Sequence, residues 1–320
     1  MDFTCLLQRI HFVFARKSPS LPPVDRQQTG ILAALGAFTL WGVLPVYWKL
    51  IDFLSPASIV AQRSLWSLLF LSLIVIAKRE VGQLGGYLRN RRMVASLLLS
   101  GLLLASNWLL YVWATLNGRI IEGALGYYLN PFFNMLFGAL WFGERHRPLQ
   151  LLAIAIALGG VALQVPAVGH FPWVALLLAL TFSLYAVVKK RAPLESRTGL
   201  TVETLLLSPL ALMWVLFHPS GESSGVGATP LQTALVIGSG LATTLPLLCF
   251  GHAARNIRLS TLGILQFLGP TLQFIIGWKV YGEPMTSSRL LSFALIWLAV
   301  ALYGAAGLAS SGKSADAGAR

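Results

Sequence analysis

Long runs of apolar residues fill most of the chain and are separated by short polar segments. A run of about 20 apolar residues crosses the roughly 30 Å hydrocarbon core of a bilayer as a helix. In lipid, backbone polar groups need partners within their own segment, which favours helices for these runs. The pattern predicts an all-α membrane protein with ten transmembrane helices, at about Gly30–Leu50, Pro56–Ala77, Met93–Thr115, Glu122–Phe142, Leu149–Val165, Phe171–Val188, Leu200–Phe217, Leu231–Gly251, Leu259–Tyr281 and Leu290–Leu308.

Lys and Arg residues concentrate in alternate gaps between these spans. Nineteen of the 24 lie in the two terminal segments and in every second gap, four lie at the opposite ends, and Arg63 lies within a span. Cytoplasmic loops carry the excess of positive charge in membrane proteins. Both termini are therefore predicted to be cytoplasmic, which requires an even number of spans.

The composition excludes several classes of protein. Hydrophobic residues make up 56% of the chain and charged residues 11%, whereas soluble domains carry about 25% charged residues. The net charge of +13 does not indicate a nucleic-acid partner, because that needs a basic face on a soluble module. Cys5 and Cys249 form no disulfide or metal pattern, and we expect no cofactor. The expected partners are a small-molecule substrate and membrane lipids, with monomer and homodimer both open.

The two halves of the chain match when one is shifted by 139 residues. Twelve identities fall between residues 100 and 144 and their mates, including Pro131 with Pro270 and Gly143-Glu144 with Gly282-Glu283. The shift pairs the third span with the eighth and the fourth with the ninth, so each repeat holds five spans and the second is inverted. Inverted repeats are typical of secondary transporters, whose substrate site lies near the membrane midplane. The predicted divisions are a cytoplasmic extension at 1–29, repeats at 30–165 and 166–309, and a disordered tail at 310–320.

Polar and aromatic side chains within the spans form the predicted substrate site. A charge inside the bilayer costs at least about 2.5 kcal/mol. Arg63 is therefore predicted to bind an anionic or polar substrate group, to donate to carbonyls of neighbouring helices, or to extend its side chain outward to the membrane surface. Asn107 and Tyr111 share a helix face because they are four residues apart. Structural hydrogen bonding between helices is the alternative for the polar residues, and a position at the membrane interface for Trp41 and Tyr47. The predicted substrate-binding residues are Trp41, Tyr47, Arg63, Asn107, Trp108, Tyr111, Tyr127, Asn130, Asn134, Gln266 and Gln273.

Pro131 and Pro270 are predicted to bend the fourth and ninth spans, because proline removes a helical hydrogen bond. No carboxylate is expected at mid-span for a proton relay, since the acidic residues lie near span ends or in gaps. Catalytic and nucleotide-binding motifs are absent. Ser239 and His252 lie more than three helical turns apart on one span, which is a poor pairing for catalysis. The sequence therefore predicts that the protein is not an enzyme.

Several stretches together carry a resemblance to a known family. They are Leu40–Leu50, Asn107–Leu110, Leu125–Pro131, Gly143–Arg145, Thr243–Phe250, Leu259–Gly263, Gly269–Leu272 and Tyr281–Glu283. The chain resembles the EamA family of the drug/metabolite transporter superfamily from about Gln27 to Leu308, and its RarD subgroup most closely. The resemblance implies the EamA fold and a permease of the bacterial inner membrane, nominally linked to chloramphenicol sensitivity. It implies no particular substrate, because this superfamily moves many kinds of solute on one scaffold.

The function expected from the sequence is transport of a small polar or amphipathic metabolite or drug by alternating access. The alternative is a membrane receptor or structural subunit that binds a ligand or partner without moving it. Cysteine accessibility that depends on ligand and is seen from both sides of the membrane would indicate a transporter. Accessibility from one side alone would not.

Overall fold

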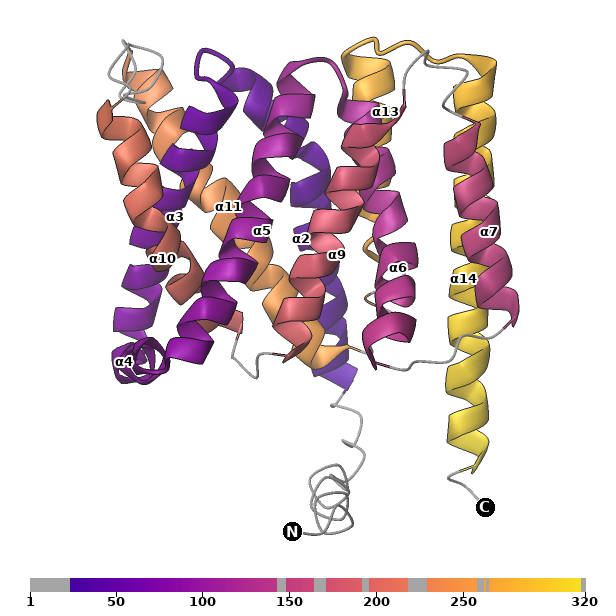
Figure 1. Cartoon of the computed structure of the whole chain (residues 1–320), viewed down its shortest axis with the longest axis horizontal. Coiled ribbons are helices and arrows are strands. Elements are labelled where there is room, and N and C mark those ends of the chain that lie inside the picture. Colours follow the sequence, from indigo (N-terminus) through magenta and orange to yellow (C-terminus); the bar gives the residue numbers. More distant parts are fainter. Residues whose placement is uncertain are drawn as a thin grey trace.

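The chain folds into a bundle of helices that run up and down, and several of them overlap in the view of Figure 1 because the bundle is more than one helix deep. The computed structural model describes residues 24–142, 148–163, 171–191, 196–217, 229–257, 262 and 265–317, and no strand occurs among them. The helices are α2 Val24–Leu50, α3 Pro56–Ala77, α4 Val81–Arg89, α5 Arg91–Leu116, α6 Ile120–Phe142, α7 Pro148–Ala162, α9 Trp173–Arg191, α10 Ser196–Phe217, α11 Pro230–Asn256, α13 Leu268–Ile275, the π-helix η1 Ile276–Val280, and α14 Ser287–Ala317.

The prediction of an all-helical membrane protein is confirmed. Among the described residues, five helices are long and apolar enough to cross a membrane, namely α2, α3, α5, α10 and α11, and three shorter apolar helices accompany them. Many large apolar side chains on these helices are exposed, as expected of surfaces that face lipid. The start of α2 and the end of α14 lie at the same edge of the bundle (Figure 1). The count of ten spans stays a prediction.

The helix starts follow local sequence signals. Ser55 caps α3, where its hydroxyl accepts the backbone N–H of Ser58 at 3.2 Å, and Pro56 occupies the first helical position. Asn90 caps α5 in the same way by accepting the N–H groups of Arg92 and Met93. Side chains of this kind satisfy backbone donors that have no partner within the helix. The α3 cap sets the register that carries Arg63 into the bundle.

Glycine allows the closest helix contacts. A Cβ atom built on Gly240 of α11 would lie 2.6 Å from backbone and side-chain atoms of Trp66 on α3. The Ser67 hydroxyl donates to the Gly240 carbonyl at 3.2 Å across the same contact. On the other side of the bundle, a Cβ on Gly126 of α6 would lie 2.8 Å from Leu178 of α9. Small residues of this kind let membrane helices approach each other closely.

Two helices extend beyond their predicted boundaries, and one helix was not predicted. Residues 24–29 belong to α2 and not to a separate extension, while residues 1–23 lie outside the described residues. Helix α14 continues to Ala317, so the tail from Ser310 is helical over most of its length. Its Ala, Ser and Lys residues include no proline that would stop a helix. Helix α4, which the apolar pattern missed because it is short and exposed, lies at the lower edge of the bundle against α5 and α10 (Figure 1).

The predicted ninth span is not one helix over its described part. Residues 266–267 form a turn, α13 begins at Leu268, and its last turn widens into the π-helix η1. Pro270 is buried in the first turn of α13, where the missing N–H costs no helical hydrogen bond. In contrast, α6 runs without interruption through position 131, and the Pro131 side chain lies outside the described residues. Bending at either proline stays a prediction.

Candidate functional site

Arg63 lies between two indole rings inside the bundle. It belongs to the second turn of α3 and is 3% exposed. Its guanidinium carbon lies 4.1 Å from the ring centroid of Trp108 on α5 and 5.0 Å from that of Trp48 on α2. Tyr111 and Tyr127 lie near the same guanidinium, and their own rings pack with centroids 5.4 Å apart. We call Arg63, Trp48, Trp108, Tyr111 and Tyr127 the Arg63 cluster.

The Arg63 cluster contains buried hydrogen-bond donors that have no partner. The Arg63 Nε, the Trp48 Nε1 and the Tyr111 hydroxyl all lack a hydrogen-bond partner. Arg63 also forms no ion pair within the described residues. Two of these atoms, the guanidinium and indole N–H groups, can only donate. The cluster therefore offers positive charge and two N–H donors, those of Arg63 and Trp48, that no described residue accepts.

Asn107 holds α5 against α9. Its amide donates to the Leu178 carbonyl and to the Thr181 hydroxyl, both at 2.9 Å, and its oxygen accepts from the Tyr127 hydroxyl at 3.4 Å. Both amide hydrogens are therefore used between helices. These contacts agree with the alternative interpretation of Asn107, in which its amide forms structural hydrogen bonds between helices. They also fix the position of the Tyr127 ring beside Arg63.

A second group of predicted site residues connects α2 with α11 and α13. Its members are Trp41, Tyr47 and Gln273. The Tyr47 hydroxyl donates to the Leu235 carbonyl of α11. Gln273 of α13 donates to the Trp41 carbonyl at 3.1 Å, while its own side-chain oxygen is buried without a partner. The Trp41 ring packs beside Phe250 with centroids 5.7 Å apart. These residues join α2 to α11 and α13, and the Tyr47 ring also packs edge-on against Trp48 of the Arg63 cluster, with centroids 5.4 Å apart.

The remaining predicted site residues fall in different environments. Asn130 is 8% exposed, and its side-chain oxygen has no partner. Asn134 is exposed, and Gln266 is half-buried at the turn before α13. The structure thus brings Arg63, Trp108, Tyr111 and Tyr127 together. Asn107 and Tyr47 each contact a member of this cluster, and no such contact is found for Trp41, Asn130, Asn134, Gln266 or Gln273 among the described residues. Among the described residues, no three His, Cys, Asp or Glu side chains lie close enough to hold a metal ion.

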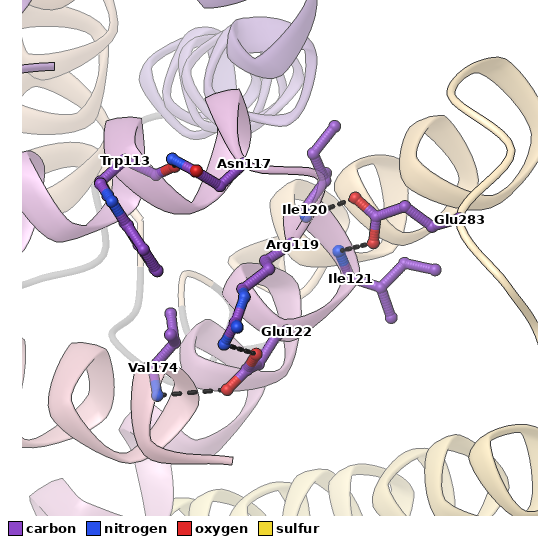
Figure 2. A network of polar contacts seen from close by, with 8 residues as sticks. All are labelled: Trp113, Asn117, Arg119, Ile120, Ile121, Glu122, Val174 and Glu283. Carbon is purple, nitrogen blue, oxygen red and sulfur yellow. Dashed lines mark hydrogen bonds and ion pairs between the residues drawn. The ribbon is translucent and has the colours of Figure 1, made fainter. Parts of the chain in front are cut away.

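A network at one end of the bundle was missed as a unit by the sequence analysis. Figure 2 shows the Glu283 carboxylate pointing at the first turn of α6, where it accepts the backbone N–H groups of Ile120 at 2.5 Å and Ile121 at 2.9 Å. Glu122 accepts the Val174 N–H at the start of α9 at 3.2 Å and pairs with Arg119 at 3.5 Å. Negative charge is favourable at these positions because helix N-termini carry a partial positive charge.

The backbone conformation after η1 positions the Glu283 side chain at the start of α6. Gly282 adopts a positive φ of 66° after η1, and the Glu283 backbone donates to the Gly277 carbonyl at 2.9 Å. Gly277 itself lets η1 approach α6, since a Cβ there would lie 2.8 Å from Ile121. Burial raises the pKa of the Glu283 carboxyl, and the N–H bonds from Ile121 and Ile120, with nearby Arg289 and Lys49, offset part of the rise. The repeated Gly-Glu pair was the signal for this residue in the sequence.

Glu203 is a third buried carboxylate, in addition to Glu122 and Glu283, and the sequence indicated only that it lies near the end of a span. It is 1% exposed in α10 and accepts a hydrogen bond from the Ser100 hydroxyl of α5. The hydrogen bond explains how a carboxylate is accommodated between two helices, since an unsatisfied polar group there would be costly. Glu203 therefore joins α10 to α5.

Comparison with known proteins adds an independent finding. Residues 28–165 match the EamA-like transporter family. An uncharacterised transporter of Pseudomonas aeruginosa is 45% identical over 275 residues, which cover 86% of this chain and 92% of that protein. Protein RarD of Salmonella typhi is 38% identical over 283 residues, which cover 88% and 96%. A solved crystal structure matches with a TM-score of 0.57 at 23% identity, over 86% of this chain and 96% of that one; this likeness concerns the fold alone.

Proposed function

Because the chain belongs to the EamA-like transporter family, among its RarD-type members, we propose that it moves a small polar or amphipathic metabolite or drug across the bacterial inner membrane. Transport proceeds by alternating access between two inverted five-helix halves, residues 30–165 and 166–309. The Arg63 cluster carries this proposal, because a charged group in the interior of a membrane bundle marks a substrate pathway more often than a structural core.

The packing of the helices supports the inverted halves. Under the 139-residue shift, α2 corresponds to α9, α11 to α5 and α13 to α6. Helix α2 packs against α11 and α13, and α9 packs correspondingly against α5 and α6. Helix α3 packs on its own counterpart α10, and α7 packs on its counterpart α14. Helices α7 and α14 form a separate pair at one side of Figure 1. Paired contacts of this kind are expected when two copies of one unit face each other across a pseudo-twofold axis.

The distribution of charge supports the orientation in the membrane. Helix α4 and the basic residues Arg89, Arg91 and Arg92 lie at the lower edge in Figure 1, as do both described ends of the chain. We place this edge in the cytoplasm, because positive loops stay on that side. The Glu283 network then lies at the outer end, where it holds the two halves together through the start of α6.

A cysteine-accessibility scan along α6 tests alternating access. Single cysteines are introduced in a chain whose Cys5 and Cys249 are replaced by serine, and each is labelled with a membrane-impermeant maleimide from either side. The proposal predicts that positions on the face toward Tyr127 react from both sides and that one substrate shifts the balance. Labelling from one side alone, unchanged by any solute of a broad panel, would support a receptor that binds without transport.

A further inference from the structure

Arg63 is a buried cation for which the surrounding helices provide no counter-charge. The buried carboxylates among the described residues are engaged elsewhere: Glu122 with Arg119 and Val174, Glu203 with Ser100, and Glu283 with the start of α6. The two indole faces stabilise the guanidinium through cation–π contacts, which place the charge without neutralising it. An isolated charge in the membrane interior remains costly unless a partner approaches.

The chemistry of the missing partner can be deduced from the donors around Arg63. The Arg63 Nε, Trp48 Nε1 and Tyr111 hydroxyl have no partner, and a buried donor left without an acceptor carries the full cost of its desolvation. An uncharged or cationic solute with few lone pairs would leave that cost in place. A carboxylate provides two oxygens and several lone pairs, and it matches the planar fork of a guanidinium.

The net charge of the solute narrows the class of possible substrates further. Arg63 is the single cation of the Arg63 cluster, so one negative charge balances it. A phosphate monoester carries about −1.5 to −2 at neutral pH and would leave excess negative charge in the membrane. A zwitterionic amino acid has a net charge of zero and would leave the charge of Arg63 without a net counter-charge. The aromatic rings of Trp108 and Tyr127 suit an apolar or aromatic body on the solute.

We propose that the Arg63 cluster binds the carboxylate of a small organic monoanion, which is the substrate class of the transporter. This inference rests on the proposed function and adds the charge and head group of the solute. The guanidinium of Arg63 binds the carboxylate, and the Trp48 N–H and the Tyr111 hydroxyl are further donors to it. The indole faces hold the guanidinium in place.

Binding is tested with the purified full chain in detergent. Thermal unfolding is followed during titration with phenylacetate, with its uncharged counterpart phenylacetamide, and with the cation 2-phenylethylamine; benzoate, lactate and pyruvate extend the set of carboxylates. The expected result is saturable stabilisation by at least one carboxylate and none by the amide or the amine. This comparison needs no variant, so it does not depend on the folding of a mutant.

Variants then assign the binding to Arg63. Arg63→Gln is expected to weaken carboxylate binding by about tenfold to a hundredfold, as for loss of a charged hydrogen-bond partner. Arg63→Lys keeps the charge but not the fork and is expected to retain part of the affinity. Tyr111→Phe removes one neutral donor and is expected to cost less than about tenfold. The proposal is overturned if no carboxylate of the set stabilises the protein, if phenylacetamide matches phenylacetate, or if Arg63→Gln binds phenylacetate as wild type does.

Flux measurements in proteoliposomes separate this inference from the proposed function. Uptake of the best-binding labelled carboxylate supports both. Flux of uncharged or cationic solutes, with every carboxylate inert, would overturn the monoanion assignment and leave the transporter proposal standing. Carboxylate binding through Arg63 without flux of any solute would leave the anion site standing and contradict transport.

Discussion

Glu283 holds the start of α6, because its carboxylate accepts the backbone N–H of Ile120 at 2.5 Å although the two residues are 163 positions apart in the sequence. The contact joins the second half of the chain to the first at the end that we place outside the cell. An N-terminal helix donor has no partner within its own helix, so this carboxylate completes α6 in the way that a capping residue normally does.

Replacing Glu283 by alanine is expected to destabilise the protein. The N–H groups of Ile120 and Ile121 would lose their acceptor in a buried position, at a cost of about 1–3 kcal/mol. Thermal or denaturant unfolding in detergent measures the change. Asp52→Asn is the matched control, since Asp52 is an exposed acid in the loop after α2 at the same end of the bundle. An equal effect of both substitutions would count against the capping role.

The raised pKa of the Glu283 carboxyl leads to a prediction of how the stability of the protein depends on pH. Burial, the largest cause, raises its pKa in the folded protein above the ordinary value of 4.5. The stability contribution of this group is therefore fully present below about pH 4.5 and is lost as pH rises through the folded-state pKa. The difference in unfolding free energy between wild type and Glu283→Gln should shrink as pH increases over that range. A difference that grows with pH would show that the pKa is lowered instead.

Asn107 is expected to matter for stability. Asn107→Ala removes two amide hydrogen bonds to α9, and side-chain bonds between membrane helices contribute about 0.6–2 kcal/mol. Asn117→Ala is the control, because that exposed amide bonds only to the Trp113 carbonyl of its own helix. Unfolding in detergent should show a loss for the first variant and little change for the second. Unchanged stability of Asn107→Ala, together with loss of solute binding, would favour direct substrate contact.

The contact between α3 and α11 depends on the absence of a side chain at position 240. Gly240→Ala would force atoms of Trp66 to move, and overpacking of this kind costs about 1–3 kcal/mol. Gly36→Ala is the control, since a Cβ at Gly36 meets nothing within 4 Å and alanine favours the helix. The two variants should change the unfolding temperature in opposite directions or by clearly different amounts. Equal tolerance at both sites would contradict the close contact.

The membrane orientation has its own test in intact cells. In the cysteine-free chain, Asn117→Cys lies at the end of α5 that we place outside, and Gln83→Cys lies on α4 at the opposite edge; both positions are exposed. An impermeant maleimide should label position 117 in intact cells and position 83 only after permeabilisation. The reverse pattern would invert the orientation derived from the positive charges.

Local sequence patterns predicted the helices because apolar length and loop charge are properties of single segments. The predictions placed Arg63 within a helix, as the structure does, and listed Tyr111 and Tyr127 among eleven residues of one site. They could not place Trp48 over Arg63, because that contact depends on how α2 crosses α3. The interruption before α13 was also beyond the apolar pattern, since Gln266 and Phe267 lie within an otherwise continuous apolar run.

The contact between Glu283 and Ile120 could not be predicted from the sequence either. The repeat singled out Gly282-Glu283 as unusual, but nothing near Glu283 in sequence indicates that its partner is a helix N-terminus in the other half. Its mate Glu144 lies outside the described residues. Sequence similarity to known transporters established the family, whereas the arrangement of donors around Arg63 required the tertiary structure.

Solute exchange by the reconstituted protein tests the central claim most directly. Liposomes that contain the purified full chain are loaded with a defined mixture of small metabolites and drugs, and the release of each compound is followed by mass spectrometry against protein-free liposomes. The account predicts accelerated release of at least one small organic solute, with monocarboxylates foremost and with the acceleration reduced in Arg63→Gln. Folded, correctly inserted protein that accelerates the release of none of them would contradict it.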